Sequence, residues 1–174
     1  MQLNSFISRL FSLSLFALPV LAVIQDEAYE LDWHIPVVGN SIRSSTFFHR
    51  PQPESKASLI YTVTDRKVVA AIHPRDGSIV WRQSLAPDLD TSTTEPPVAL
   101  PADGKVITAA GRVIRAWDAA DGRLHWSIEL NVEINDAKLS KEQDVVVLGT
   151  DGSVRKIDGQ VGSVIEDYYN FLPQ

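Results

Sequence analysis

Cysteine is absent from this chain of 174 residues. The protein therefore forms no disulfide and has no thiolate for metal binding or redox chemistry, so its stability must come from packing. Clustered positive charge is also missing, because the 16 Lys and Arg residues are scattered and the net charge is −6. Nonspecific binding to nucleic acid depends on neutralising phosphates, so we expect no nucleic-acid partner. The sequence also contains no Asn-x-Ser/Thr acceptor, and we expect no N-glycosylation.

Long apolar runs are scarce, and the one that exists lies near the N-terminus. It extends from Leu10 to Leu21, follows Arg9 and is interrupted only by two serines and a proline. It is shorter than the roughly 20 apolar residues that span a bilayer, and Val20-Leu21-Ala22 provides the small residues of a cleavage site. We predict a signal peptide over residues 1–22 and a mature domain over residues 23–174. A retained membrane anchor is the alternative.

Motifs that carry catalytic chemistry are missing as well. The four histidines show no metal-ligand spacing, and neither a Gly-x-Ser-x-Gly motif nor a phosphate-binding glycine loop occurs. His125 alternates with apolar residues, which indicates a sheet-face or rim position. We therefore predict no catalytic residue, no cofactor and no metal, and we expect that the chain is not an enzyme.

What the sequence does contain is a repeat. Residues 76–81 (DGSIVW) and residues 121–126 (DGRLHW) share an Asp-Gly turn followed by tryptophan, 45 residues apart. Asp-Gly between apolar runs is the strongest short-range signal for a β-hairpin. A fixed period of this size, with several strands in each unit, is typical of a β-propeller or a related array of stacked sheets.

A weaker third copy follows, in which Gly162 lies 40 residues after Gly122 and Glu166 stands where tryptophan is expected. Strand-like runs precede each turn, so we place three repeat units at about residues 58–85, 105–130 and 144–169. The structural positions of the repeat are Asp76, Gly77, Trp81, Asp118, Asp121, Gly122, Trp126 and Gly162.

The tryptophans define a packing hypothesis. An aromatic side chain buries about 150–250 Å², enough to fill the space between neighbouring sheets, so we predict that Trp81 and Trp126 are plugs between repeat units. No strong amphipathic helix is evident after residue 23, and the predicted class is all-β: a partial β-propeller of about three blades. An antiparallel sandwich with similar hairpins is the alternative. The proline-containing stretch from Ala86 to Asp103 is expected to be an exposed loop.

The spacing of Ala116, Asp118, Gly122 and Trp126 resembles the blade repeat of quinoprotein-like propellers. A longer resemblance uses more of the chain: residues 26–39 (DEAYELDWHIPVVG), then residues 74–82 (PRDGSIVWR), then residues 111–117 (GRVIRAW), in this order. Together they resemble the N-terminal part of the family of subunit 1 of the endoplasmic reticulum membrane protein complex. The stretch from Phe47 to Pro51 is similar to fungal members.

This resemblance implies a function. Members of the family have a large lumenal part built on propellers, and their complex inserts tail-anchored and multipass proteins into the endoplasmic reticulum membrane. The resemblance therefore implies a lumenal scaffold at that membrane, with the other subunits of the complex and client membrane proteins as partners. Three units do not close a propeller ring, so we expect that the chain is the front part of a longer protein or a shortened product. Alternatives are a quinoprotein-like enzyme and a lumenal sensor of folding stress.

Overall fold

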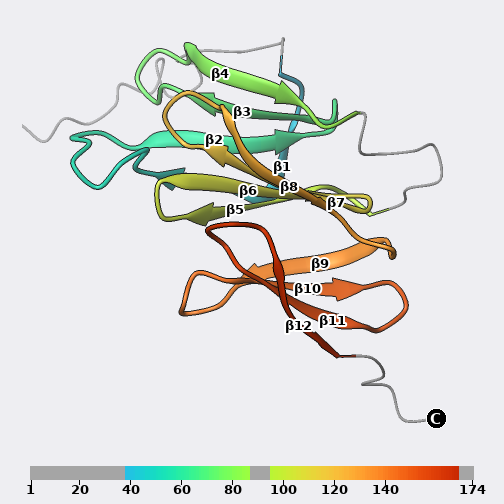
Figure 1. The fold of residues 1–174 in the computed structure, drawn as a ribbon. Coiled ribbons are helices and arrows are strands. Elements are labelled where there is room, and N and C mark those ends of the chain that lie inside the picture. Colours follow the sequence, from blue (N-terminus) through green and yellow to red (C-terminus); the bar gives the residue numbers. More distant parts are fainter. Residues whose placement is uncertain (1–37, 87–94, 169–174) are drawn as a thin grey trace, which may run out of the picture. The chain divides into compact units, whose positions relative to one another are not determined.

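The computed structural model describes residues 38–86 and 95–168, and within these ranges it contains twelve β-strands and no α-helix. The strands form three separate four-stranded sheets, each an antiparallel meander in sequence order, which we call blades 1, 2 and 3 (Figure 1). Blade 1 comprises β1 (Ser41–His49), β2 (Leu59–Thr64), β3 (Val68–Ile72) and β4 (Ile79–Ser84). Blade 2 comprises β5 (Val98–Ala102), β6 (Lys105–Ala110), β7 (Val113–Asp118) and β8 (Leu124–Glu129). Blade 3 comprises β9 (Ile134–Leu139), β10 (Val145–Gly149), β11 (Val154–Ile157) and β12 (Val164–Tyr168).

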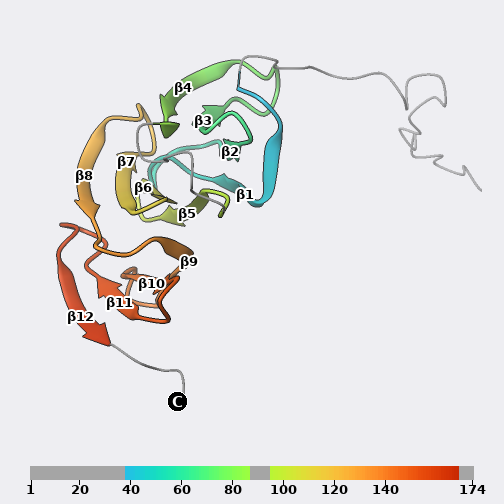
Figure 2. The same cartoon turned by 90° about the vertical axis from the view of Figure 1, so that its right-hand side faces the viewer.

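This architecture confirms the all-β, partial-propeller prediction. A sandwich would pair its strands into two facing sheets, whereas here each set of four strands is hydrogen-bonded only within its own meander. Figure 2 shows that the first strand of every blade lies on one side and the last strand, β4, β8 or β12, on the other. Each blade also begins with a strand, β1, β5 or β9, that precedes the expected repeat unit.

Most of the core lies between blades, although a smaller buried cluster of Val38, Ala70 and Ile72 lies at blade 1. One buried cluster joins Tyr61, Val69 and Trp81 of blade 1 to Val106 and Trp117 of blade 2. A second buried cluster joins blade 2 to blade 3; its members include Ile107, Ile114, Trp126, Val145 and Ile157. A single four-stranded sheet cannot bury its own apolar face, so each blade depends on its neighbour for stability.

The proline-containing stretch between blades 1 and 2 requires a correction. We expected a loop from Ala86 to Asp103, but residues 98–102 form β5, which pairs with β6. Pro101 lies within β5 opposite Val106. Proline cannot donate a hydrogen bond to a sheet, but β5 is the edge strand of blade 2 and needs partners on one side only. The loop prediction was therefore wrong for this segment, because it treated proline as a strand breaker in every context.

Candidate functional site

The three repeat units share one turn, formed by residues 73–78, 118–123 and 158–163. In each, the fifth residue is a glycine whose N–H donates to the carbonyl of the first residue, at 2.9 Å in all three turns. The N–H of the first residue donates to the carbonyl of the sixth, at 2.7–2.8 Å. The glycines Gly77, Gly122 and Gly162 have φ of 69°, 72° and 75°, a left-handed conformation that glycine adopts without steric cost. We call these three segments the repeat turns.

Trp81, on β4 of blade 1, lies against the repeat turn of blade 2. Its indole N–H donates to the carbonyl of Ala119 at 2.9 Å. A Cβ placed on Gly122 would come within 2.6 Å of the indole ring, so the ring lies directly on the glycine. Gln83, two residues further along β4, donates to the carbonyl of Gly122 at 3.0 Å. Strand β4 thus contacts the repeat turn of blade 2 through one aromatic face and two hydrogen bonds.

Trp126, on β8 of blade 2, repeats this arrangement on blade 3. Its indole N–H donates to the carbonyl of Gly159 at 3.2 Å, and a Cβ on Gly162 would come within 2.6 Å of the ring. Ala119 and Gly159 occupy the same position, three residues before the glycine of their repeat turn. Both indoles therefore use one geometry: the ring covers the glycine, and the N–H reaches the carbonyl three residues before it.

Blade 3 ends differently. All five residues of β12 are exposed, and Glu166 occupies the position of Trp81 and Trp126. Its apolar side chains Val164 and Ile165 are 43% and 47% exposed. Arg155 of β11 lies opposite Asp167 of the neighbouring strand β12, and its Nε donates to Asp167 at 3.2 Å. Within the described residues, blade 3 therefore has no tryptophan at the position that Trp81 and Trp126 occupy in blades 1 and 2.

The acidic positions of the repeat stabilise the turns themselves. Asp76 accepts hydrogen bonds from the backbone N–H of Ser78 at 2.9 Å and from its hydroxyl at 2.8 Å, and these two bonds lower the pKa of Asp76. Asp121 accepts the N–H of Arg123 at 2.9 Å in the same way. Both carboxylates are exposed, and each accepts these hydrogen bonds from residues of its own turn, as in an Asx turn.

Asp118 has the densest set of contacts. Its Oδ1 accepts the N–H groups of Ala120 at 2.8 Å and Asp121 at 3.3 Å, and its Oδ2 lies 3.4 Å from Nε2 of His125. Burial opposes ionisation of Asp118, but the backbone N–H groups and His125 outweigh it, and the net effect lowers its pKa. In blade 3, Asp158 accepts the equivalent pair of backbone N–H groups, at 2.7 Å and 3.0 Å. This position therefore shapes the repeat turn.

Tyr61 is a contributor that sequence reasoning missed. This fully buried residue of β2 donates its hydroxyl to the carbonyl of Ala119 at 2.8 Å, beside the indole N–H of Trp81. Its ring lies 6.0 Å from that of Trp81. Burial, together with the nearby Asp118 carboxylate, raises the pKa of Tyr61. The signal available in the sequence was an aromatic residue within an apolar strand, but its hydroxyl partner lies 58 residues away.

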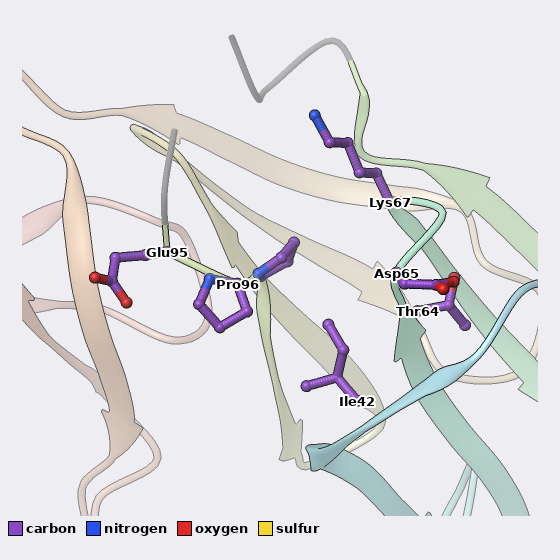
Figure 3. Close-up of a pocket in the computed structure, with 7 residues that line it drawn as sticks. Ile42, Thr64, Asp65, Lys67, Glu95 and Pro96 are labelled. Atoms are coloured by element: carbon purple, nitrogen blue, oxygen red, sulfur yellow. The ribbon is translucent and has the colours of Figure 1, made fainter. Parts of the chain in front are cut away.

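A pocket of about 290 Å³ lies beside the start of β1. It is lined by Ile42, Thr64, Asp65, Lys67, Glu95, Pro96 and Pro97 (Figure 3). The side-chain amide and the backbone N–H of Asn40 both donate to Asp65 at 2.9 Å and lower its pKa. Figure 3 shows the carboxylates of Asp65 and Glu95 pointing in opposite directions. Because these charged groups do not converge, the pocket provides no acid–base pair.

Within residues 38–86 and 95–168, no cluster of three or more His, Asp or Glu side chains has the geometry to hold a metal ion. The same residues include no helix of the length and apolarity needed to cross a membrane. The predicted signal peptide at residues 1–22, and most of the motif from Asp26 to Gly39, lie outside the described residues. The candidate site of the described residues is therefore the pair of tryptophans between blades, Trp81 and Trp126, with the repeat turns that they contact.

Comparison with known proteins identifies the family. The model of the EMC1 N-terminal beta-propeller domain matches residues 22–167. The chain belongs to this family. This EMC1-type propeller is 28% identical over 130 residues to ER membrane protein complex subunit 1 of Gallus gallus, covering 72% of the chain and 12% of that protein. It is 25% identical over 109 residues to the Schizosaccharomyces pombe protein of the same name, covering 63% of the chain and 11% of that protein.

The EMC1-type propeller is thus a small part of the length of these relatives, and the resemblance to this family, fungal members included, is confirmed. Among solved structures, quinohemoprotein alcohol dehydrogenase from Comamonas testosteroni superimposes with a TM-score of 0.58 at 18% identity. The match covers 76% of this chain and 21% of that one. At this identity the likeness shows the fold alone, a propeller built of quinoprotein-like blades.

Proposed function

We propose that this EMC1-type propeller is a non-enzymatic lumenal scaffold in the ER membrane protein complex, the assembly that inserts tail-anchored and multipass proteins. The observation that carries the proposal is the family match over residues 22–167, together with relatives named as subunit 1 of that complex. Its partners are then the other subunits of the complex and client membrane proteins, and residues 1–22 act as the signal that directs the domain into the lumen.

The chemistry of the described residues supports a scaffold. The buried side chains of Tyr61, Trp81 and Trp126 donate to backbone carbonyls of a neighbouring blade. Such groups set the geometry between blades and are not available to a substrate. Propellers bind partners through loops and strand edges without catalytic groups, so a chain that uses its side chains in this way is suited to assembly.

The lumenal location has a direct test, because these 174 residues contain no N-glycosylation acceptor. A Lys56→Asn change completes an Asn-Ala-Ser acceptor in the exposed loop between β1 and β2. In the full-length protein we expect a mobility shift on gels that endoglycosidase H removes. Lys56→Gln is the matched control and should migrate as the wild type. A Lys56→Asn protein that is expressed but never glycosylated would contradict the lumenal assignment.

The scaffold role is tested by complementation. Cells that lack the endogenous subunit are given the full-length protein, either wild type or with Trp126→Ala at the junction of blades 2 and 3. We expect the wild type to co-purify with the other subunits and to restore the level of a tail-anchored client, and the variant to lose both in parallel. Restored client levels without co-purification would argue against a role through assembly.

The quinoprotein-like enzyme remains as a second candidate only because of the fold likeness. It is tested by incubating the purified full-length protein with pyrroloquinoline quinone and calcium. A stable complex with a shifted absorbance spectrum, and reduction of the quinone by an alcohol, would favour the enzyme over the scaffold. We expect neither.

A further inference from the structure

A second pocket, of about 400 Å³, is lined by residues of all three blades. Its lining residues are His49, Pro101, Ala102, Asp103 and Gln143. His49 is the last residue of β1, Ala102 is the last residue of β5, and Gln143 lies in the turn between β9 and β10. The volume is within the range of about 300–1,000 Å³ that is usual for ligand pockets. We call this cavity the three-blade pocket.

His49 has a buried polar atom without a protein partner. Its Nε2 is shielded from solvent and has no hydrogen-bond partner among the described residues. The ring meets that of Tyr61 edge-on, with the centroids 6.0 Å apart. Most buried polar groups in proteins are hydrogen-bonded, and an unpaired one destabilises the fold. A neutral imidazole nitrogen can accept a hydrogen bond from a group that enters the pocket.

Asp103 gives the pocket its charge. Its side chain is exposed and makes no hydrogen bond or ion pair with another residue of the described ranges. Lys105, the nearest cation along the chain, instead donates its ammonium group to Gln160 at 2.5 Å. The lining, taken over residues 38–86 and 95–168, contains neither Lys nor Arg. The pocket therefore favours a cationic group over an anionic one.

Gln143 is held in place by its turn. Its φ is 68°, in the left-handed region that few residues other than glycine adopt. Its N–H donates to the carbonyl of Ser140 at 3.2 Å, and the hydroxyl of Ser140 accepts the N–H of Asp144 at 3.2 Å. The carbonyl of Gln143 packs so closely on Gly159 that a Cβ there would come within 2.0 Å of it. The side-chain amide oxygen of Gln143 is therefore presented from a fixed backbone as a further acceptor.

We propose that the three-blade pocket binds a basic side chain, arginine or lysine, of a partner protein. The charge of this side chain pairs with the Asp103 carboxylate, and its N–H groups donate to the amide oxygen of Gln143 and to Nε2 of His49. Pro101 and Ala102 contact its aliphatic stem, since long basic side chains bury their stems on apolar surface. That the partner is another subunit of the ER membrane protein complex rests on the function proposed above, whereas the chemistry of the pocket does not.

Photocrosslinking in the full-length protein tests the proposal. The photoreactive residue p-benzoylphenylalanine replaces Gln143, crosslinked peptides are mapped by mass spectrometry, and co-purifying subunits are identified in the same sample. We expect crosslinks to a segment of another protein that contains Arg or Lys. The same residue at position 81 is the positive control and should crosslink to residues 118–122, which Trp81 contacts. At Thr150, exposed at the opposite end of β10, it is the negative control.

A charge exchange tests the contact itself, because capture of a neighbouring protein is not sufficient. Asp103→Arg should abolish the crosslink from position 143. Asp103→Asn replaces a charge-assisted hydrogen bond by a neutral one and should lower the yield about fivefold. Changing the basic residue of the captured segment to aspartate should restore the crosslink to the Asp103→Arg protein. A crosslink that survives Asp103→Arg, or a captured segment that lacks Arg and Lys, would overturn the proposal.

The pocket and the proposed function fail in different ways in this experiment. Other subunits that co-purify with the protein, without a crosslink from position 143, would overturn the pocket proposal alone. A crosslink to a basic segment of an unrelated protein, sensitive to Asp103→Arg and restored by the charge exchange, would support the pocket and contradict the assignment to the complex.

His49→Phe separates binding from stability. Phenylalanine keeps an aromatic ring against Tyr61 and removes the unpaired nitrogen, so the urea midpoint should stay the same or rise while the crosslink yield falls. His49→Gln retains an acceptor and should keep more of the crosslink than His49→Phe. A His49→Phe protein with a lower midpoint and an unchanged crosslink would show that the nitrogen serves the fold and not the pocket.

Discussion

Removing the indole of Trp81 is the most informative single perturbation of this propeller. Trp81 is 7% exposed, its ring lies on Gly122, and its N–H donates to Ala119 at 2.9 Å. Trp81→Ala empties the space between blades 1 and 2 and removes one of the two hydrogen bonds that β4 makes to the repeat turn of blade 2. The Gln83 bond to the Gly122 carbonyl remains.

The expected magnitude follows from these contacts. Burying about 150–250 Å² of aromatic surface at about 25 cal/mol per Å² corresponds to about 4–6 kcal/mol, part of which the alanine methyl retains. The lost hydrogen bond adds about 1 kcal/mol. The Ala119 carbonyl is not left unpaired, because the Tyr61 hydroxyl still donates to it at 2.8 Å. We therefore expect Trp81→Ala to lower the free energy of unfolding by about 3–5 kcal/mol, the usual range for such truncations.

The assay is urea denaturation of the full chain followed by far-ultraviolet circular dichroism, which does not depend on tryptophan fluorescence. Trp81→Phe is the matched control: it keeps an aromatic ring on Gly122 and removes the N–H, so it should cost less than half as much. A Trp81→Ala effect below about 1 kcal/mol, the size of one hydrogen bond, would refute the view that this ring holds two blades together. Equal effects of Ala and Phe would show that the hydrogen bond, not the ring, matters.

Three further predictions follow from the same geometry. Gly122→Ala should lower the unfolding free energy by about 2–4 kcal/mol, because the new methyl group strains the backbone and overlaps with the indole. Gly104 has a φ of 64° and open space around it, so Gly104→Ala should lower the unfolding free energy by only about 1–2 kcal/mol, from backbone strain alone. Urea denaturation of both variants measures this difference. Asp118 has a lowered pKa in the folded state, so its contribution to stability is complete above the ordinary aspartate pKa and is lost as the pH falls through the folded pKa. Asp118→Asn should therefore reduce the loss of stability at acid pH. An unchanged dependence of stability on pH in this range would contradict the prediction. Asp167→Ala should lower the unfolding free energy by about 1–2 kcal/mol, less than the loss of a fully buried pair, because Arg155 is 4% exposed but Asp167 is 31% exposed. A loss of the β-sheet signal at neutral pH without urea would contradict this small effect.

The periodic parts of the fold were predictable from the sequence. The Asp-Gly turns predicted hairpins because glycine accepts φ near 70° and the aspartate accepts nearby N–H groups, as Gly122 and Asp121 do. The strands around them were equally clear, since β-branched and apolar residues alternate there. The residues missed were those whose role depends on a distant partner: Tyr61, whose acceptor lies 58 positions later, and Pro101, whose place in an edge strand depends on pairing with β6.

The sequence by itself therefore determined most of the local units: the strands and turns of three repeat units, an all-β class, and a repeat with tryptophan at a fixed offset from glycine. These features depend on backbone conformation and side-chain alternation, which neighbouring residues dictate. Only the tertiary structure decided where each tryptophan goes. The indole of one blade lies on the glycine of the next and donates to the carbonyl three residues before that glycine, and the hydrogen-bonded residues are 38 and 33 positions apart. Spacing can suggest such a contact, but it forms only when two complete sheets are packed together and neither can bury its apolar face alone.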